Sequence, residues 1–368
     1  MMARAGKGDA VTEGRTVKIS EAKKYIRKAM NVKRPVMLWG PPGVGKSDIA
    51  AQLAEDMGGA LIDVRLNLWE PTDIKGIPFY NSTTNTMEWA PPAELPSEEF
   101  ASQYPVVVLF LDELAGAPPA VQAAAYQLIL NRRVGTYRLP DNVVIAAAGN
   151  RESDKGVTYR MPKPLANRFL HYEVRVDFED WFDWAVRHNI HPDVVGYLTT
   201  FKEDLYNFDA GSSERSFATP RSWAFVSDTL KDVEDFTEEE VTDMVAAGIG
   251  EGVALKFKAH RAVAAQLPNP TDILKGKVKE LHTKNISAKY SLTTALCYEL
   301  KEVFANNDPK AHEMFDNFLE FVQHNFEAEM VVMANTIALG KYQIRVKFNQ
   351  LNNWKPFIQK YGKLIEMA

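Results

Sequence analysis

Residues 35–47 have the sequence PVMLWGPPGVGKS, in which an apolar run leads into a glycine-rich turn. The last eight of these residues fit the pattern G-x-x-x-x-G-K-[ST], and a helical pattern over Ser47–Met57 follows them. Glycines let the backbone wrap closely around phosphate groups, and the amides at the start of the helix supply positive potential. We therefore predict a phosphate-binding loop formed by Gly40, Pro41, Pro42, Gly43, Val44, Gly45, Lys46 and Ser47.

Two side chains of this loop have expected roles. Lys46 is expected to reach the β- and γ-phosphates of a nucleotide, and Ser47 is expected to offer its hydroxyl to Mg²⁺. The alternative is a glycine-rich turn that contains a lysine by chance. That alternative leaves the strand before the turn and the helix after it unexplained, so we favour the phosphate-binding loop.

A second apolar run, Val106–Leu111, ends in Asp112 and Glu113. A phosphate-binding loop alone binds a nucleotide without hydrolysing it, so hydrolysis needs further groups. A buried strand that ends in two acids would place Asp112 to hold Mg²⁺ and Glu113 to polarise the attacking water. The alternative is that both carboxylates are simply the solvated end of a strand.

A third apolar run, Val143–Ala148, is followed by Gly149 and Asn150. The amide of Asn150 could orient the water or sense the γ-phosphate. Taken alone, an asparagine at a strand end is most often a turn former. Beside the two acids it becomes a candidate site residue.

The chain alternates apolar runs with helical patterns over residues 17–178, which predicts a three-layer α/β core with a parallel sheet, as in P-loop NTPases. Continuous apolar character indicates strands covered on both faces. The predicted strands are Pro35–Trp39, Leu61–Leu66, Val106–Leu111 and Val143–Ala148, and the predicted helices are Ser20–Met30, Ser47–Met57 and Pro119–Leu130. Two hairpins are predicted as well, at 77–90 and at 132–141.

Helical patterns dominate the rest of the chain. We predict an all-α lid over residues 179–268 and a mainly helical C-terminal region over 269–368, divided by the sequence Leu-Pro-Asn-Pro at 267–270. The segment Tyr342–Phe348 is a candidate strand within that last region. Residues 1–16 are expected to be a disordered lead, because they are rich in glycine, alanine and charge.

The composition is that of an ordinary globular protein, with 46% hydrophobic and 25% charged residues and a formal net charge of -5. No apolar stretch is long enough to cross a bilayer, and the single cysteine, Cys297, cannot form an internal disulfide. We therefore expect a soluble protein in the reducing cytoplasm. The net charge argues against coating nucleic acid through bulk charge.

In this order the three strand ends resemble those of AAA+ ATPases. The sequence LDELAGAPPAVQ at 111–122 resembles the MoxR branch in particular, a helix-2-insert clade of the dynein-related AAA_5 type. The likeness covers about residues 17–230. Within it, the segment 70–91 resembles the helix-2 insertion, and 132–141 resembles the hairpin before sensor 1.

The resemblance implies roles for three further residues. Asn150 resembles the sensor-1 asparagine, Arg168 resembles the arginine finger that enters a neighbouring subunit's site, and Arg221 resembles the sensor-2 arginine of the lid. Each arginine is a fixed cation that could neutralise charge on a transferring phosphoryl group. The alternative for either arginine is a surface salt bridge.

A finger that acts on a neighbour implies a ring, and the family implies a hexamer that uses ATP with Mg²⁺. Members of this branch remodel or activate other proteins, often together with a protein that carries a von Willebrand factor A domain. The charged stretch Gly149–Pro162 departs from the family pattern and resembles the signature loop of related restriction motors that use GTP. A GTP-using motor therefore stays open, and so does a nucleic-acid motor, because Arg132, Arg133 and Arg138 lie in a predicted hairpin.

The C-terminal segment 341–363 mixes six basic with five aromatic residues. Such a mixture can bind single-stranded nucleic acid, but it also serves as an ordinary packing or docking surface, which we favour. His188 and His191 lie at a predicted helix end with no third ligand near them in the sequence, so we predict no metal site there.

Overall fold

A computed structural model describes residues 15–154, 156 and 158–366. The chain divides into two compact units, Met1–Asp177 and Phe178–Ala368. The expected disordered lead lies outside the described residues except for its last two positions, and Thr16 already belongs to a strand. Among the described residues, every helix is too short or too polar to span a bilayer.

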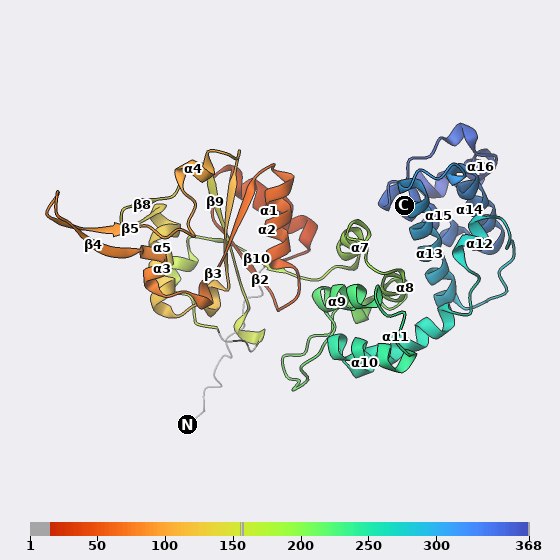
Figure 1. The fold of residues 1–368 in the computed structure, drawn as a ribbon, viewed down its shortest axis with the longest axis horizontal. Coiled ribbons are helices and arrows are strands. Elements are labelled where there is room, and N and C mark those ends of the chain that lie inside the picture. Colours follow the sequence, from red (N-terminus) through yellow and green to blue (C-terminus); the bar gives the residue numbers. More distant parts are fainter. Residues whose placement is uncertain (1–14, 155, 157, 367–368) are drawn as a thin grey trace, which may run out of the picture. The chain divides into compact units, whose positions relative to one another are not determined.

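The first unit is built on a parallel sheet, as predicted, and this sheet has six strands (Figure 1). The order across the sheet is β1-β10-β2-β9-β6-β3, and every neighbouring pair is parallel. The strands are β1 (Thr16–Val17), β10 (Leu170–Val174), β2 (Val36–Trp39), β9 (Val143–Gly149), β6 (Val107–Asp112) and β3 (Ala60–Arg65).

Helices cover both faces of this sheet, which is why β6 and β9 are apolar on both sides. Figure 1 shows α1 (Ile19–Asn31) and α2 (Lys46–Asp56) on one face and α3 (Pro71–Lys75) and α5 (Pro119–Asn131) on the other. All seven residues of β9 are buried. Two short helices, α4 (Glu98–Ala101) and α6 (Lys163–Ala166), complete this unit. The predicted three-layer α/β core with a parallel sheet is thereby confirmed.

Two strands of the sheet, β1 and β10, are absent from the sequence prediction. β1 has only two residues, too few to form a recognisable run. β10 has the sequence LHYEV, in which His171 and Glu173 lie one strand repeat apart and so face the same side. His171 and Glu173 face residues of the site described below, not the apolar core. Strand β10 therefore lacks the continuous apolar run by which the other strands were predicted.

Both predicted hairpins are present. The first consists of β4 (Ile77–Asn81) and β5 (Thr86–Ala90), and the second of β7 (Arg133–Val134) and β8 (Tyr137–Arg138). They are joined where the Thr136 hydroxyl donates to the Trp89 carbonyl at 2.8 Å. The first hairpin leaves Tyr80 and Met87, which pair across its strands, about two-thirds exposed.

The described residues of the second unit form helices and the loops that connect them. Its helices are α7 (Phe178–Arg187), α8 (Pro192–Thr200), α9 (Pro220–Leu230), α10 (Glu238–Ile249), α11 (Glu251–Ala264), α12 (Pro270–Leu274), α13 (Ile286–Ala305), α14 (Ala311–Asn325), α15 (Ala328–Asn335) and α16 (Trp354–Glu366). Side chains near the amino ends of several helices fix where those helices begin. Thr219 caps α9 ahead of Pro220, and Thr237 forms a capping box with Glu240 on α10. His191 caps α8. The expected boundary between 268 and 269 falls inside this unit and stays a prediction.

The strand predicted at Tyr342–Phe348 is wrong. A π-helical turn, Thr336–Lys341, precedes this segment, which then runs on without pairing to any described strand. The Tyr342 amide donates to the Ile337 carbonyl and closes the turn instead. In the basic and aromatic segment 341–363, the aromatic side chains of Phe357 and Tyr361 on α16 are buried. Their burial agrees with a role in packing. The sole cysteine, Cys297, is buried in α13.

His260 on α11 is a buried group whose titration should affect the stability of this unit. Its side chain is 6% exposed, its Nε2 lies 2.6 Å from Ser291 Oγ, and its Nδ1 lies 3.1 Å from Ser287 Oγ. Burial lowers the pKa of His260 below its ordinary value, and the charge of Asp193 offsets part of this effect. The folded state therefore resists protonation more than the unfolded state does.

We expect the stabilisation that depends on neutral His260 to be present above about pH 6.5 and to be lost as pH falls through the lower folded-state pKa. The difference in Tm between wild type and His260→Gln should therefore narrow from pH 7.5 to pH 5.5 in thermal unfolding. His282→Gln is the matched control, because the His282 side chain is 85% exposed. If the difference in Tm between wild type and His260→Gln stays constant from pH 7.5 to pH 5.5, His260 does not contribute to stability through its neutral form.

Candidate nucleotide site

The predicted phosphate-binding loop joins β2 to α2, as expected. Gly43 and Gly45 have φ values of 77° and 89°, a left-handed conformation that glycine adopts without strain. A β-carbon on Gly40 would lie 3.0 Å from the Val174 carbonyl oxygen, so the loop begins in close contact with β10. The Val44 side chain is 1% exposed, so it holds the loop against the protein interior. Because α2 begins at Lys46, its first amides face the loop.

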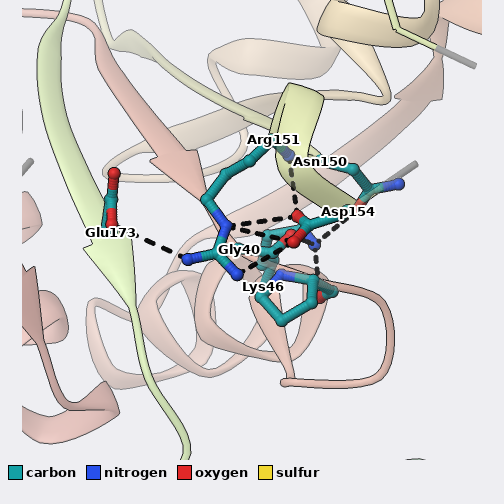
Figure 2. Close-up of polar contacts among 7 residues, drawn as sticks. Gly40, Lys46, Asn150, Arg151, Asp154 and Glu173 are labelled. Atoms are coloured by element: carbon teal, nitrogen blue, oxygen red, sulfur yellow. Dashed lines mark hydrogen bonds and ion pairs between the residues drawn. The ribbon is translucent and has the colours of Figure 1, made fainter. Parts of the chain in front are cut away.

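Lys46 is 8% exposed, and its ammonium group is surrounded by oxygen atoms. It donates to the carbonyls of Gly40 at 2.6 Å and Pro41 at 2.9 Å, and to Asn150 Oδ1 at 3.0 Å (Figure 2). A lysine held in this way is fixed at the mouth of the loop. The contact with Asn150 joins two segments that lie 104 residues apart in the sequence.

Ser47 and Asp112 meet at the ends of their elements, where the Ser47 hydroxyl donates to Asp112 Oδ2 at 3.1 Å. Asp112 Oδ1 accepts the Glu113 amide at 2.9 Å, which fixes the carboxylate orientation. Partial burial, followed by the negative charge of Asp112, raises the pKa of the Asp63 carboxyl on β3, while Arg65 acts against this rise. Asp63 and Asp112 on the neighbouring strands β3 and β6 therefore lie close enough to interact electrostatically.

Glu113 follows β6 with φ 54° and ψ 31°, in the left-handed region. A non-glycine residue adopts this conformation at a cost, and such residues are found disproportionately at functional sites. The turn directs the chain into a short 3₁₀ helix, Leu114–Gly116, and away from the strand direction. Glu113 Oε2 lies 3.5 Å from Asn150 Nδ2, the longest of the contacts that link these segments.

Asn150 connects the two halves of the site. Its Oδ1 accepts from Lys46 and its Nδ2 faces Glu113, so one amide lies between the loop lysine and the second acid. All of these groups lie at the carboxyl ends of the neighbouring strands β2, β9 and β6. Parallel strands bring such ends to one edge of a sheet, where α/β proteins bind ligands.

Arg168 lies apart from this edge. It follows α6 and comes two residues before Leu170, which pairs with Val36 at the amino end of β2. The phosphate-binding loop begins after Trp39, about 10 Å further along the strand. The Arg168 side chain is exposed and, within the described part of the chain, forms no ion pair or side-chain hydrogen bond.

Arg221 lies in the second unit, on the first turn of α9, and its side chain is exposed. Its contact with nucleotide stays a prediction. Arg132, which the sequence places among candidate hairpin cations, has an internal role instead, because its guanidinium donates to the carbonyls of Pro140 and Val143. Burial lowers the pKa of Arg132. Arg133 and Arg138 are exposed and directly opposite each other across the hairpin.

Sequence reasoning missed four residues that border the site. Arg151 and Asp154, which follow Asn150, form an ion pair at 2.9 Å, and Glu173 on β10 lies 3.8 Å from Arg151 (Figure 2). His171 accepts a hydrogen bond from Trp39 at 2.8 Å, directly before the loop. The alternation of polar residues in LHYEV was the only signal in the sequence for the β10 pair.

These residues fit a magnesium nucleotide. Ser47 and Asp112 supply hard oxygen ligands of the kind that Mg²⁺ prefers, 3.1 Å apart. Burial and then the negative charge of Asp112 raise the pKa of Asp63, and a divalent cation bound at Asp112 would offset the second of these effects. The glycine turn, the α2 amides and Lys46 together suit phosphate oxygens.

Residues 35–169 match the family model of the AAA domain of the dynein-related subfamily. The chain is 29% identical over 184 residues to midasin of Giardia intestinalis, a match that spans 48% of this chain and 4% of midasin. Residues 35–169 of this chain are therefore similar to the AAA domain of the dynein-related subfamily.

Solved structures resemble the chain only weakly. The RuvB Holliday junction branch migration motor of Thermotoga maritima has a TM-score of 0.35 and 17% identity, with 70% of this chain and 74% of RuvB covered. NtrX of Brucella abortus has a TM-score of 0.36 and 15% identity, with 69% and 62% covered. The fold assignment accordingly depends on the strand order and the motifs of this chain.

Proposed function

We propose that this chain is an ATP-hydrolysing motor of the MoxR type, which assembles into a hexameric ring and remodels or activates a partner protein. The observation that supports it best is the meeting of three strand ends. Ser47 contacts Asp112, and the Asn150 amide lies between Lys46 and Glu113. A binding loop, two metal ligands and a water-polarising acid are the parts that phosphoryl transfer to water needs.

Each residue has a task in this proposal. Lys46 and the loop amides bind and orient the phosphates, while Ser47 and Asp112 would hold Mg²⁺, which neutralises charge on the phosphate oxygens when bound. Glu113 accepts a proton from the attacking water, and Asn150 holds that water in line. Arg221 is proposed to contact nucleotide bound in its own subunit.

The position of Arg168 supports assembly into a ring. The residue lies toward the amino ends of the strands, while the site lies at the carboxyl ends, and its side chain has no ion-pair partner among the described residues. Such a cation is better suited to a neighbour's site than to its own. We further propose that the partner is a protein client or a von Willebrand factor A domain protein, and that the motor works in the cytoplasm.

A nucleic-acid motor is the second candidate, because Arg133 and Arg138 are exposed and opposite each other on the second hairpin. Like charges directly opposite on a hairpin repel each other, and a bound polyanion would relieve this. Stimulation of turnover by DNA or RNA would favour this candidate. A preference for GTP over ATP would instead favour the related GTP-using motors.

The test is release of inorganic phosphate from ATP and from GTP by the purified chain with Mg²⁺. We expect turnover of ATP, and we expect Lys46→Ala to weaken ATP binding about 10- to 150-fold, the range for loss of a hydrogen bond to a charged group. Lys24→Ala is the matched control, because it removes an exposed lysine from α1. An absence of nucleotide binding by the wild-type chain would overturn the proposal.

A further inference from the structure

The segment that follows Asn150 closes onto itself through one ion pair. The Arg151 Nε donates to both carboxylate oxygens of Asp154, at 3.2 and 3.3 Å, and its Nη2 donates to Oδ1 at 2.9 Å. The backbone joins as well, since the Arg151 amide donates to Asp154 Oδ2 at 2.8 Å and the Asp154 amide donates to the Arg151 carbonyl at 3.0 Å. Figure 2 shows this closed arrangement beside Lys46 and Gly40.

Burial makes this pair different from a surface salt bridge. Asp154 is 7% exposed, and a buried carboxylate is costly unless it is paired and fully hydrogen-bonded. Here it accepts from both a guanidinium and a backbone amide. The short turn Glu152–Asp154 is thereby held in one conformation by its own side chains.

The same arginine also reaches the sheet. Its Nη1 lies 3.8 Å from a Glu173 carboxylate oxygen, and Glu173 is the β10 residue opposite Trp39, the last residue before the phosphate-binding loop. Arg151 therefore connects the turn at 152–154 with the strand beside that loop. Its own backbone continues directly from Asn150.

Asn150 is thus held on both sides. On its amino side, a β-carbon on Gly149 would lie 2.7 Å from the Ala115 β-carbon, so the strand end packs tightly against the segment after Glu113. On its carboxyl side, Arg151 is fixed by Asp154. An asparagine side chain has only two rotatable bonds, so the backbone on its two sides largely decides where its amide points.

We propose that Arg151 and Asp154 form a positioning clamp, the 151–154 clamp, which holds the Asn150 amide between Lys46 and Glu113 for hydrolysis. This inference rests on the proposed function and assigns a role to the charged segment after sensor 1. The clamp acts through Asn150 and takes no part in binding the nucleotide. It matters because a displacement of about 1 Å in a positioning group can slow a reaction roughly 100-fold.

The experiment compares ATP turnover in full-length wild type, Asn150→Ala, Asp154→Asn and the Asn150→Ala/Asp154→Asn double variant. Asp154→Asn keeps the size of the side chain and removes its charge. We expect it to lower kcat about 10- to 100-fold and to leave KM and the Kd for ATP near wild type. Because the clamp works through Asn150, the double variant should be no slower than Asn150→Ala alone.

Two further variants complete the design. Arg151→Lys keeps the positive charge but cannot make the bidentate contact, so it should show the same fall in kcat, and it replaces Asp154→Asn if that variant fails to fold. Glu152→Gln is the matched control, because Glu152 is an exposed acid in the same turn and has no side-chain partner among the residues that the structure describes. It should retain wild-type kcat.

The outcomes separate this inference from the proposed function. If wild type hydrolyses ATP and Asn150→Ala is slow, the proposed function stands. The clamp is then overturned by wild-type kcat in both clamp variants, by losses that multiply in the double variant, or by a rise in Kd equal to the fall in kcat. If wild type does not turn over ATP, the proposed function and the clamp both fail.

Discussion

Glu113→Gln should bind ATP with near wild-type affinity and hydrolyse it about 100- to 10,000-fold more slowly, the range associated with loss of a general base. Binding depends on the loop, α2 and Lys46, none of which this substitution changes. The amide of glutamine has the shape of the carboxylate but cannot accept a proton from water. Single-turnover phosphate release, measured beside the Kd for ATP, separates the two effects.

The matched control for this experiment is Glu55→Gln, which makes the same change on the exposed side of α2. It should retain wild-type turnover. Turnover by Glu113→Gln at the wild-type rate would remove Glu113 from the role of base. The inactive variant, loaded with ATP, is also the best reagent for capturing a client, because a motor that cannot hydrolyse ATP is expected to keep hold of its partner.

Arg168→Ala should retain nucleotide binding and lose roughly 1,000-fold or more in turnover, the scale associated with an arginine finger. The position of Arg168 in the fold indicates that it acts on the site of a neighbouring subunit. Arg168 precedes a strand whose first residue is level with the start of β2, so within its own chain it is separated from the loop by the length of that strand. Arg160→Ala, which removes another exposed arginine nearby, should have little effect.

Mixing Arg168→Ala with Glu113→Gln tests whether the finger acts on a neighbour. In a randomly mixed ring, about a quarter of the sites would combine an intact Glu113 with an intact Arg168 from the adjacent subunit. Activity should therefore recover on mixing. Arg168→Ala mixed with the Arg168→Ala/Glu113→Gln double variant should not recover, and a failure of the first mixture to recover would contradict action between subunits.

The sequence was most informative where burial and chemistry coincide. The strands ending at Trp39, Asp112 and Gly149 are apolar on both sides, because helices cover both faces of the sheet, and each leads into site residues at the same edge. The motifs at these strand ends assign Ser47 and Asp112 to the same Mg²⁺, which requires the two side chains to lie close together. That contact is present at 3.1 Å.

Other parts of the site depend on pairings that a linear pattern does not contain. Glu173 reaches Arg151 because β10 lies beside β2, a neighbour relation that neither short strand reveals. Asp154 is buried, although an acid within a charged stretch reads as solvated. The wrong strand at Tyr342–Phe348 has a similar origin, since alternating apolar residues predict a strand only if a partner strand is present.

The backbone of Glu113 has a consequence for how this residue can change. An L-amino acid in the left-handed region costs roughly 1–2 kcal/mol, whereas glycine enters it freely and asparagine more easily than most. The left-handed backbone after β6 is therefore less strained with glycine or asparagine than with glutamate. At position 113 the backbone favours glycine or asparagine, whereas hydrolysis needs a carboxylate. A related protein that no longer hydrolyses nucleotides would therefore be more stable with glycine or asparagine at this position than with glutamate.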